Sequence, residues 1–249
     1  MTQEEFDKLQ EGLPNDKMAI REGIVVEVGE GAYDSYPRFG YQFFSFRSPE
    51  MVQELDAFIK YAKGKTCFLD IGSFHGVFSQ VFTAINEKGV AYAFEPYHEP
   101  FNMLSKVVKD KPIIIFQAAL SDNSGRLSLY ESDGHLVSKE IGNKVEVPAT
   151  TGDAFCFGMW PNIMPDFIKI DVESHELKVL HGLSNVINKH RPTILLELHY
   201  SVLSQLEVIE IMEFISWYKY IVFDIEKDLP IPVSSLLMQK QGEKRIILK

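Results

Sequence analysis

Residues 67–85 read CFLDIGSFHGVFSQVFTAI, and this stretch decides the fold. The first five residues form a short apolar run of strand length. Two glycines, Gly72 and Gly76, follow with the freedom for a tight turn, and from Val77 apolar residues recur at helical spacing. A strand, a glycine turn and a helix in this order predict one unit of a strand–helix–strand fold.

The same alternation continues along the chain. Apolar runs of strand length recur at residues 90–94, 113–116, 167–172, 193–198, 220–225 and 245–248, with helical patterns between most of them. Apolar strands that alternate with helices indicate a parallel sheet covered on both faces, so we predict a doubly wound α/β fold closed by an antiparallel edge. In the helix expected over 202–218, the residues predicted to face inward are Leu206, Ile209, Met212 and Ile215.

Two regions depart from this alternation. Residues 121–165 hold a turn and two alternating stretches, which predict a hairpin-bearing insertion. Residues 1–62 are expected to form a cover or lid segment with a helix, ahead of a main domain over 63–249. Seven aromatic residues crowd 33–46, beside Arg38 and Arg47. They indicate either a strand-and-turn cover packed on the main domain or a lid over a pocket.

Charge and composition limit the classes of partner that we expect. The 249 residues include 25 basic and 35 acidic side chains, so the formal net charge is −10. Nucleic acids and anionic membrane surfaces attract basic proteins, and we expect neither as a partner. No apolar run approaches the roughly 18 residues of a membrane span, and the acidic start does not resemble a secretory signal. Two cysteines, Cys67 and Cys156, cannot alone form a zinc site. We therefore expect a soluble cytoplasmic protein.

Ligands of such sheets bind at the carboxyl ends of the strands, which makes the residues after each apolar run the candidates. Phe74 stands where a dinucleotide-binding G-x-G-x-x-G loop has its middle glycine, and its side chain would obstruct a pyrophosphate. Glu95 ends the next strand, where a carboxylate can accept hydrogen bonds from a ribose diol. Together they favour a nucleoside without a pyrophosphate, and S-adenosylmethionine fits that description.

Acidic residues and histidines follow two later strands. Asp171, Glu173 and Glu176 surround His175 within six residues, and His199 follows Glu197 after the next strand. Such crowding is unfavourable unless the groups are paired, solvated or used, and neighbouring strands would bring both sets to one cleft. His175 could instead cap a helix, and His199 could be an ordinary loop residue.

Residues 166–182, DFIKIDVESHELKVLHG, resemble the signature segment of the FkbM family of S-adenosylmethionine-dependent methyltransferases, I-K-I-D-V-E-G-H-E-x-x-V-L-x-G. The family's following Pro-led strand that ends in Glu corresponds to residues 191–197. The loop over 69–76, the Glu95-Pro96 pair and residues 118–125 also match, so the resemblance covers about 66–200. Two departures stand out: Ser174 replaces the usual glycine, and Ser73-Phe74 replace Ala-Asn.

The resemblance implies a class I methyltransferase fold, a seven-stranded sheet with an antiparallel last strand. It also implies methyl transfer from S-adenosylmethionine, mostly to hydroxyls of sugars or secondary metabolites. Asp171 would lie by the sulfonium or amino group of the cofactor, and Glu95 would hold its ribose. The other cofactor-binding residues that it implies are Asp70, Gly72, Ser73, Phe74, Gly76 and Pro96 around the methionine and ribose, and Gln117, Ala118 and Ala119 around the adenine.

A hydroxyl acceptor needs a base near neutral pH, and the candidates are Glu173, His199 and, third, His175. We expect Glu173 to orient the acceptor and His199 to take the proton. Asp171, Glu173, Glu197 and His199 could chemically hold a divalent ion, but we expect no metal because two of them have other roles. Two rival functions stay open: a non-catalytic module that binds S-adenosylmethionine or S-adenosylhomocysteine, and an NAD-dependent oxidoreductase. The sequence specifies neither the acceptor nor the oligomeric state.

Overall fold

The computed structural model describes residues 8–9, 11–13, 17–21, 23–28, 49–132, 135–138, 140, 142–159 and 163–249. The aromatic segment 33–46 and most of the helix predicted near the start lie outside these residues. None of the helices in the described part combines the length and the apolarity that a bilayer crossing requires.

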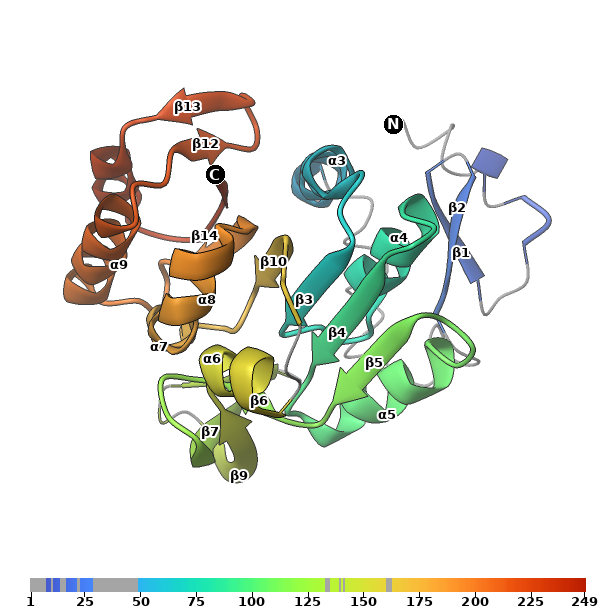
Figure 1. The fold of residues 1–249 in the computed structure, drawn as a ribbon, viewed down its shortest axis with the longest axis horizontal. Helices are drawn as coiled ribbons and strands as arrows, with labels where there is room; N and C mark the ends of the chain where they lie inside the picture. Colours follow the sequence, from blue (N-terminus) through green and yellow to red (C-terminus); the bar gives the residue numbers. More distant parts are fainter. Residues whose placement is uncertain are drawn as a thin grey trace.

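A central sheet of eight strands, counted over the described residues, organises the molecule (Figure 1). Its order is β13-β12-β14-β11-β10-β3-β4-β5, and the run from β11 to β5 is parallel, as the alternating pattern predicts. The bounds of these strands are β3 Cys67–Ile71, β4 Val90–Phe94, β5 Ile113–Phe116, β10 Phe167–Ile170, β11 Thr193–His199, β12 Val222–Asp224, β13 Leu229–Ile231 and β14 Glu243–Leu248.

The last strand is antiparallel, but it does not lie at the edge of the sheet. β14 inserts between β11 and β12 and runs antiparallel to both, whereas the edge is formed by the short β13. The expected antiparallel edge is present, because β12, β13 and β14 all pair antiparallel with their neighbours, and the last strand of the chain lies inside that edge. This position gives β14 a neighbour on each side, and its last three residues are buried.

Helices cover both faces of the sheet. Alternate side chains of each strand point to opposite faces, so Phe68 and Phe167 meet one helical layer while Ile71 and Ile170 meet the other. Phe58 packs its ring edge against Phe68 at 5.3 Å and Phe167 at 5.4 Å. The first layer contains α3 Pro49–Ala62, α4 Val77–Ile85 and α5 His98–Val107, and the second α7 Glu176–Gly182, α8 Ser184–His190 and α9 Gln205–Trp217.

The inward face of α9 agrees with the prediction at Met212 and Ile215, which pack against the core, but not at the other two positions. Leu206 is 70% exposed and Ile209 37% exposed, whereas the residues buried against the core are Val208, Ile211, Phe214 and Ile215. A spacing of three residues turns a helix by about 300°, so a set repeated every three drifts by about 180° over three steps and cannot share one face. The helix begins at Gln205 because Ser204 and Glu207 form a capping box.

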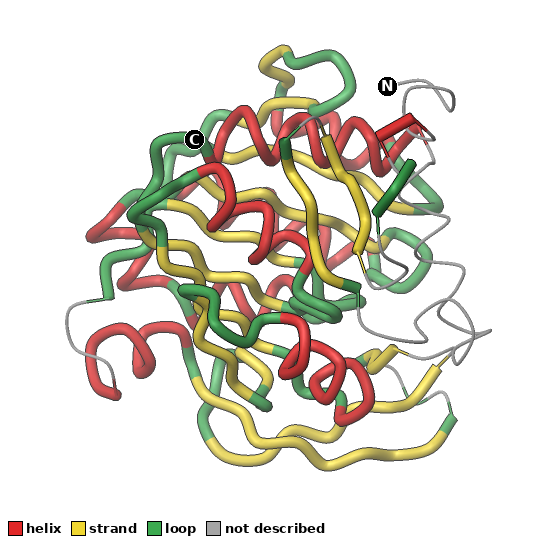
Figure 2. The backbone as a smooth tube through the Cα atoms, turned by 90° about the vertical axis from the view of Figure 1, so that its right-hand side faces the viewer, coloured by secondary structure: helices red, strands yellow, loops and turns green. Residues whose placement is uncertain are grey.

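The predicted insertion is present as a separate small sheet, which lies at the bottom of both views (Figures 1 and 2). β7 pairs antiparallel with β9, which confirms the hairpin. Phe155, in the helical turn that follows, is fully buried and packs edge-on against Phe94 and Phe116. The elements are β6 Ala119–Leu120, β7 Gly125–Ser132, β8 His135–Val137, β9 Asn143–Thr150, the short α6 Gly152–Ala154 and a π-helical turn Phe155–Met159. A 3-10 helix, Val233–Met238, lies between β13 and β14.

A hairpin near the start of the chain packs on the main domain. β1 Lys17–Arg21 pairs antiparallel with β2 Ile24–Glu27, where a strand was predicted. The Gln80 side chain on α4 both accepts from and donates to the backbone of Glu27, at 2.9 Å each. Met18, Ile20 and Val26 join the same buried cluster as α3 and α4. The boundary predicted at 62/63 stays a prediction, but the described part of 1–62 shares its core with the sheet.

Ile20→Ala is expected to lower the free energy of unfolding by about 2–4 kcal/mol, because it opens a cavity in the shared core. The matched control is Val25→Ala on the same hairpin, since Val25 is 43% exposed and its truncation should cost less than about 0.5 kcal/mol. Denaturant melts of both variants measure the difference. Equal, negligible effects would show that the hairpin is a detachable cover.

Candidate functional site

The loop after β3 is pressed against two neighbouring strands. Gly72 has a φ of +79°, and a Cβ there would lie 1.7 Å from the carbonyl oxygen of Asp171. The backbone N–H groups of Gly72 and Ser73 both donate to the carbonyl of Phe94 at 3.0 Å. Only glycine satisfies the backbone conformation and the close approach together. Gly76 also has a positive φ and leads into α4. The loop thus lies at the carboxyl edge of β10, β3 and β4.

Phe74 positions Glu95. The Phe74 backbone has a φ of +49°, and its N–H donates to Glu95 Oε2 at 2.9 Å. The N–H of Tyr97, beyond the half-buried Pro96, donates to Glu95 Oε1 at 2.8 Å. Each carboxylate oxygen keeps a further lone pair for another donor. Burial raises the pKa of Glu95 to about 7, although both backbone donors oppose this rise.

Two polar atoms at this loop have no hydrogen-bond partner within the described part of the chain. Asp70 is buried, and its Oδ2 accepts a hydrogen bond from the Ser79 hydroxyl at 2.6 Å. Its Oδ1 and the Ser73 Oγ are buried with no hydrogen-bond partner among the described residues. Burial raises the pKa of Asp70 to about 6, despite the opposing charge of Lys169. Buried polar groups normally have partners, so these two atoms indicate that a polar ligand completes the loop.

The predicted adenine-side residues follow β5 along the same edge. Gln117 is exposed, Ala118 is half-buried and Ala119 is buried at the start of β6. The N–H of Glu95 donates to the carbonyl of Phe116, which joins the end of β4 to the end of β5. Their contact with adenine stays a prediction.

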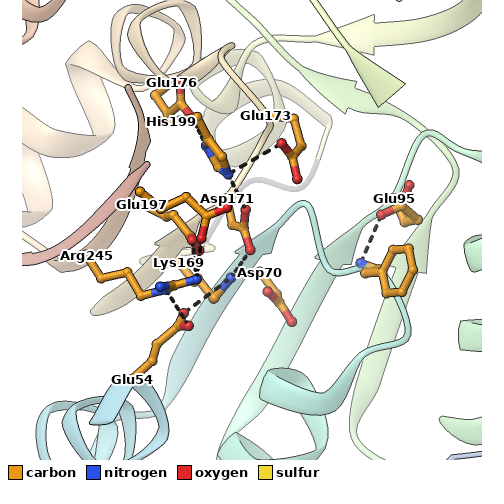
Figure 3. Close-up of polar contacts among 12 residues, drawn as sticks. Glu54, Asp70, Glu95, Lys169, Asp171, Glu173, Glu176, Glu197, His199 and Arg245 are labelled. Carbon is orange, nitrogen blue, oxygen red and sulfur yellow. Dashed lines mark hydrogen bonds and ion pairs between the residues drawn. The ribbon is translucent and has the colours of Figure 1, made fainter. Parts of the chain in front are cut away.

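The acidic cluster lies at the ends of the next two strands, as predicted, and surrounds His199 (Figure 3). His199 is buried, and its Nδ1 lies 2.6 Å from Oε1 of the fully buried Glu176. Its Nε2 lies 3.5 Å from Glu173 Oε2 and 3.7 Å from Asp171 Oδ1. Asp171 and Glu173 are partly exposed, so the cluster is open on one side.

Charges within the cluster set its protonation. Burial would lower the pKa of His199, but the hydrogen bond with Glu176 and the charges of Asp171 and Glu173 outweigh burial and raise it to about 9. Burial would raise the pKa of Asp171, but Lys169 and His199 hold it below its usual range. Without a ligand, the His199 imidazole is therefore mostly protonated at neutral pH. Its neutral form, which can accept a proton, is the minority.

Buried charges that the sequence analysis did not single out lie beneath the cluster. Lys169 Nζ lies 2.7 Å from Asp171 Oδ2 and 3.7 Å from Glu54 Oε1 on α3. Arg245 on β14 pairs with Glu54 at 2.8 Å and also with Glu197 (Figure 3). A signal was available: in the run FIKI, Lys169 is a charge inside a strand buried on both faces.

His175 stands at the N-cap position of α7, where the capping alternative places it, although its side chain makes no capping hydrogen bond there. Glu173 and Ser174, with φ values of +49° and +80°, form a left-handed turn just before it. Ser174 thus occupies a conformation that favours glycine, and its hydroxyl lies 2.7 Å from that of Ser138 in the insertion. The His175 ring contacts Ser121 at 2.9 Å, and burial lowers its pKa to about 4. Its described polar contacts lie away from His199.

Comparison with known proteins gives a matching family model, a relative in sequence and a solved structure of similar fold. The model of the methyltransferase FkbM domain matches residues 70–222. The hexuronic acid methyltransferase AglP of Haloferax volcanii is 30% identical over 141 residues, 53% of this chain and 56% of that protein. The solved methyltransferase FkbM of Methylobacillus flagellatus KT is similar in fold, with a TM-score of 0.51 and 14% identity over 74% of this chain and 43% of that one. The chain therefore spans about half the length of these relatives.

Lys169→Met is expected to lower the free energy of unfolding by about 3–5 kcal/mol, because it leaves buried carboxylates without their cation. The matched control is Lys60→Met, since the Lys60–Asp228 ion pair is exposed and its loss should change little. Thermal and denaturant melts of both variants test this. Equal stability of the two variants would contradict the buried pairing.

Proposed function

The chain belongs to the methyltransferase FkbM domain family, and from that premise we propose that it transfers a methyl group from S-adenosylmethionine to a hydroxyl oxygen of a sugar or hydroxylated metabolite. The observation that carries the proposal is that two features lie together at one edge of the sheet. One is a glycine loop with buried polar atoms that no described residue pairs with, and the other is an acidic cluster that is partly exposed. Gly72 joins them, since it contacts Asp171 directly.

The loop residues suit the charges of the cofactor. S-adenosylmethionine carries an ammonium and a sulfonium, and buried Asp70 Oδ1 and Ser73 Oγ are acceptors that no described residue pairs with. Glu95 has a free lone pair on each oxygen for the two ribose hydroxyls. Phe74 departs from the family pattern, but its backbone N–H holds Glu95 in position. This observation favours a functional cofactor site over a degenerate one.

The acidic cluster suits the acceptor. The reaction forms a carbon–oxygen bond as the carbon–sulfur bond breaks, and the acceptor hydroxyl loses its proton. Asp171, Glu173 and His199 would bind and align that hydroxyl, which is the main demand of an in-line transfer. The base role proposed for His199 requires the minority neutral form of its imidazole. Glu173, which is partly exposed, is the alternative proton acceptor.

The acceptor class has support from one relative. AglP, which matches about half of this chain, is named a hexuronic acid methyltransferase. A sugar acceptor is therefore the first class to test, with a panel of hexuronic acids, neutral hexoses and their glycosides. Methyl transfer from radiolabelled S-adenosylmethionine to a hydroxyl of this panel would support the proposal. Cofactor binding without transfer to any acceptor would favour the non-catalytic binding module instead.

Cofactor affinity should depend on the ionisation of Glu95. The carboxylate accepts both ribose hydrogen bonds only when ionised, so affinity should rise with pH, by about fourfold from pH 6.5 to 8.5 for a pKa of about 7. In Glu95→Gln this rise should disappear, and affinity at high pH should fall by roughly tenfold or more. Calorimetric titration with S-adenosylhomocysteine measures both. An unchanged affinity in a folded Glu95→Gln protein would disprove the ribose role.

Acceptor alignment should depend on the cluster and not on the cofactor loop. Glu173→Gln and His199→Asn are each expected to lower turnover by roughly 10²–10⁴-fold while leaving cofactor affinity within a few-fold. Single-turnover transfer and cofactor titration on the same preparations give the two quantities. Full turnover in both variants would move the acceptor site away from this cluster.

A further inference from the structure

We propose that Asp171, Glu173 and His199 bind one divalent cation, of the kind that accepts both carboxylate oxygens and an imidazole nitrogen. This replaces the expectation, from sequence, that no metal is bound. The three side chains come from the ends of two adjacent strands, and one ligand atom from each lies within 4.8 Å of the others. Mn²⁺ is the best-matched probe, because it accepts oxygen and imidazole ligands together.

The separations fit ligands around an ion better than hydrogen bonds. Nε2 of His199 lies 3.5 Å from Glu173 and 3.7 Å from Asp171, which is longer than an ordinary N–H···O hydrogen bond. Ligand atoms that share an ion through bonds of about 2.1 Å lie about 3.0–3.5 Å apart, depending on geometry. The two separations from Nε2 are therefore within a few tenths of an ångström of those around an ion.

The imidazole of His199 is already oriented toward the proposed cation site. Glu176 is fully buried and binds Nδ1 at 2.6 Å, which fixes the ring and turns Nε2 between the two carboxylates (Figure 3). A carboxylate that orients a histidine through its other ring nitrogen is a regular companion of metal sites. Within the described residues, Nε2 of this 4% exposed side chain makes no hydrogen bond. Its described neighbours are Glu173 and Asp171, at ion-pair rather than hydrogen-bond distance, so this ring nitrogen is aimed between two prospective ligands.

The two oxygens of Asp171 are divided between its neighbours. Oδ2 pairs with Lys169 at 2.7 Å, and Oδ1 faces His199. Asp171 and Glu173 therefore present two carboxylates to Nε2 of His199. The partial exposure of Asp171 and Glu173 leaves positions for water or for the acceptor.

A second group, Glu197, His199 and Glu243, also has the spacing for an ion. Both of its carboxylates already pair with Arg245, and Glu243 is 48% exposed. A guanidinium that occupies both carboxylates competes with a metal ion there. The cluster at Asp171 and Glu173 is therefore the favoured site.

In catalysis the cation would bind the acceptor oxygen and lower the pKa of its hydroxyl, and this use rests on the proposed function. The hydroxyl proton passes to solvent, the oxygen takes the methyl group, and S-adenosylhomocysteine leaves. His199 is then a ligand and not the base, and the ion displaces the proton from its Nε2 into solvent on binding.

Mn²⁺ titration of the whole chain, followed by electron paramagnetic resonance without cofactor, tests the site. We expect one Mn²⁺ per chain, with affinity at least tenfold weaker in Asp171→Asn, Glu173→Gln and His199→Gln. Glu176→Gln should weaken binding by roughly 10–100-fold although it is not a ligand. Glu210→Gln, an exposed carboxylate on α9, and Glu243→Gln should bind as the wild type does. Circular dichroism checks folding, and the partly exposed Glu173 decides the case if a buried variant unfolds.

The proposal is overturned if no saturable Mn²⁺ binding occurs up to millimolar concentration, if all four cluster variants retain it, or if Glu243→Gln abolishes it. Methyl transfer is measured on the same protein with chelator and after Mn²⁺ is restored. Transfer that continues in chelator, with no Mn²⁺ bound, refutes the cation site and leaves the proposed function intact. Site-specific Mn²⁺ binding without cofactor binding or transfer supports the cation site and refutes the function.

Discussion

The ion pair of Lys169 with Asp171 is the constraint on which the site depends. Lys169 lies in β10, a strand buried on both faces, and an unpaired ammonium there would be prohibitively costly. Its position follows from the alternation of side chains along the strand. Phe167 packs in the core, and Lys169, two residues further along on the same face, carries a charge. Asp70 and Glu197 follow Phe68 and Leu195 in the same way on the neighbouring strands. A layer of charge thus lies directly above a layer of phenylalanine and leucine.

The two halves of the edge are connected through backbone atoms. Gly72 contacts the carbonyl of Asp171, and the carbonyl of Phe94 accepts the N–H groups of both Gly72 and Ser73. Glu95 in turn holds the N–H of Phe74. The residues proposed to bind the methyl donor and those proposed to bind the methyl acceptor are therefore held at a fixed distance by the ends of strands. This rigidity suits a reaction that depends on alignment.

Sequence reasoning found the groups at the strand ends because carboxyl ends of parallel strands share one edge. Asp70, Glu95, Asp171 and His199 all lie there. It did not find Glu54 and Arg245, since their pairing joins α3 to β14 across most of the chain and no local pattern records it. The face of α9 was predicted correctly at Met212 and Ile215 but wrongly at Leu206 and Ile209, because a three-residue spacing does not follow the helical period. Ser174 stands where the family has glycine, and that glycine was an available signal for the left-handed turn.

The route by which the charge layer assembles has a consequence for folding. Glu54, Lys169, Glu197 and Arg245 are separated by about 190 positions, so their meeting requires closure of very long loops. A partly folded chain in which β14 has not yet inserted would hold Glu54 and Glu197 together without Arg245 between them. Such a species is electrostatically frustrated, and it should be poorly populated. The site's charges thereby favour an all-or-none folding transition, in which the site exists only when the whole sheet does.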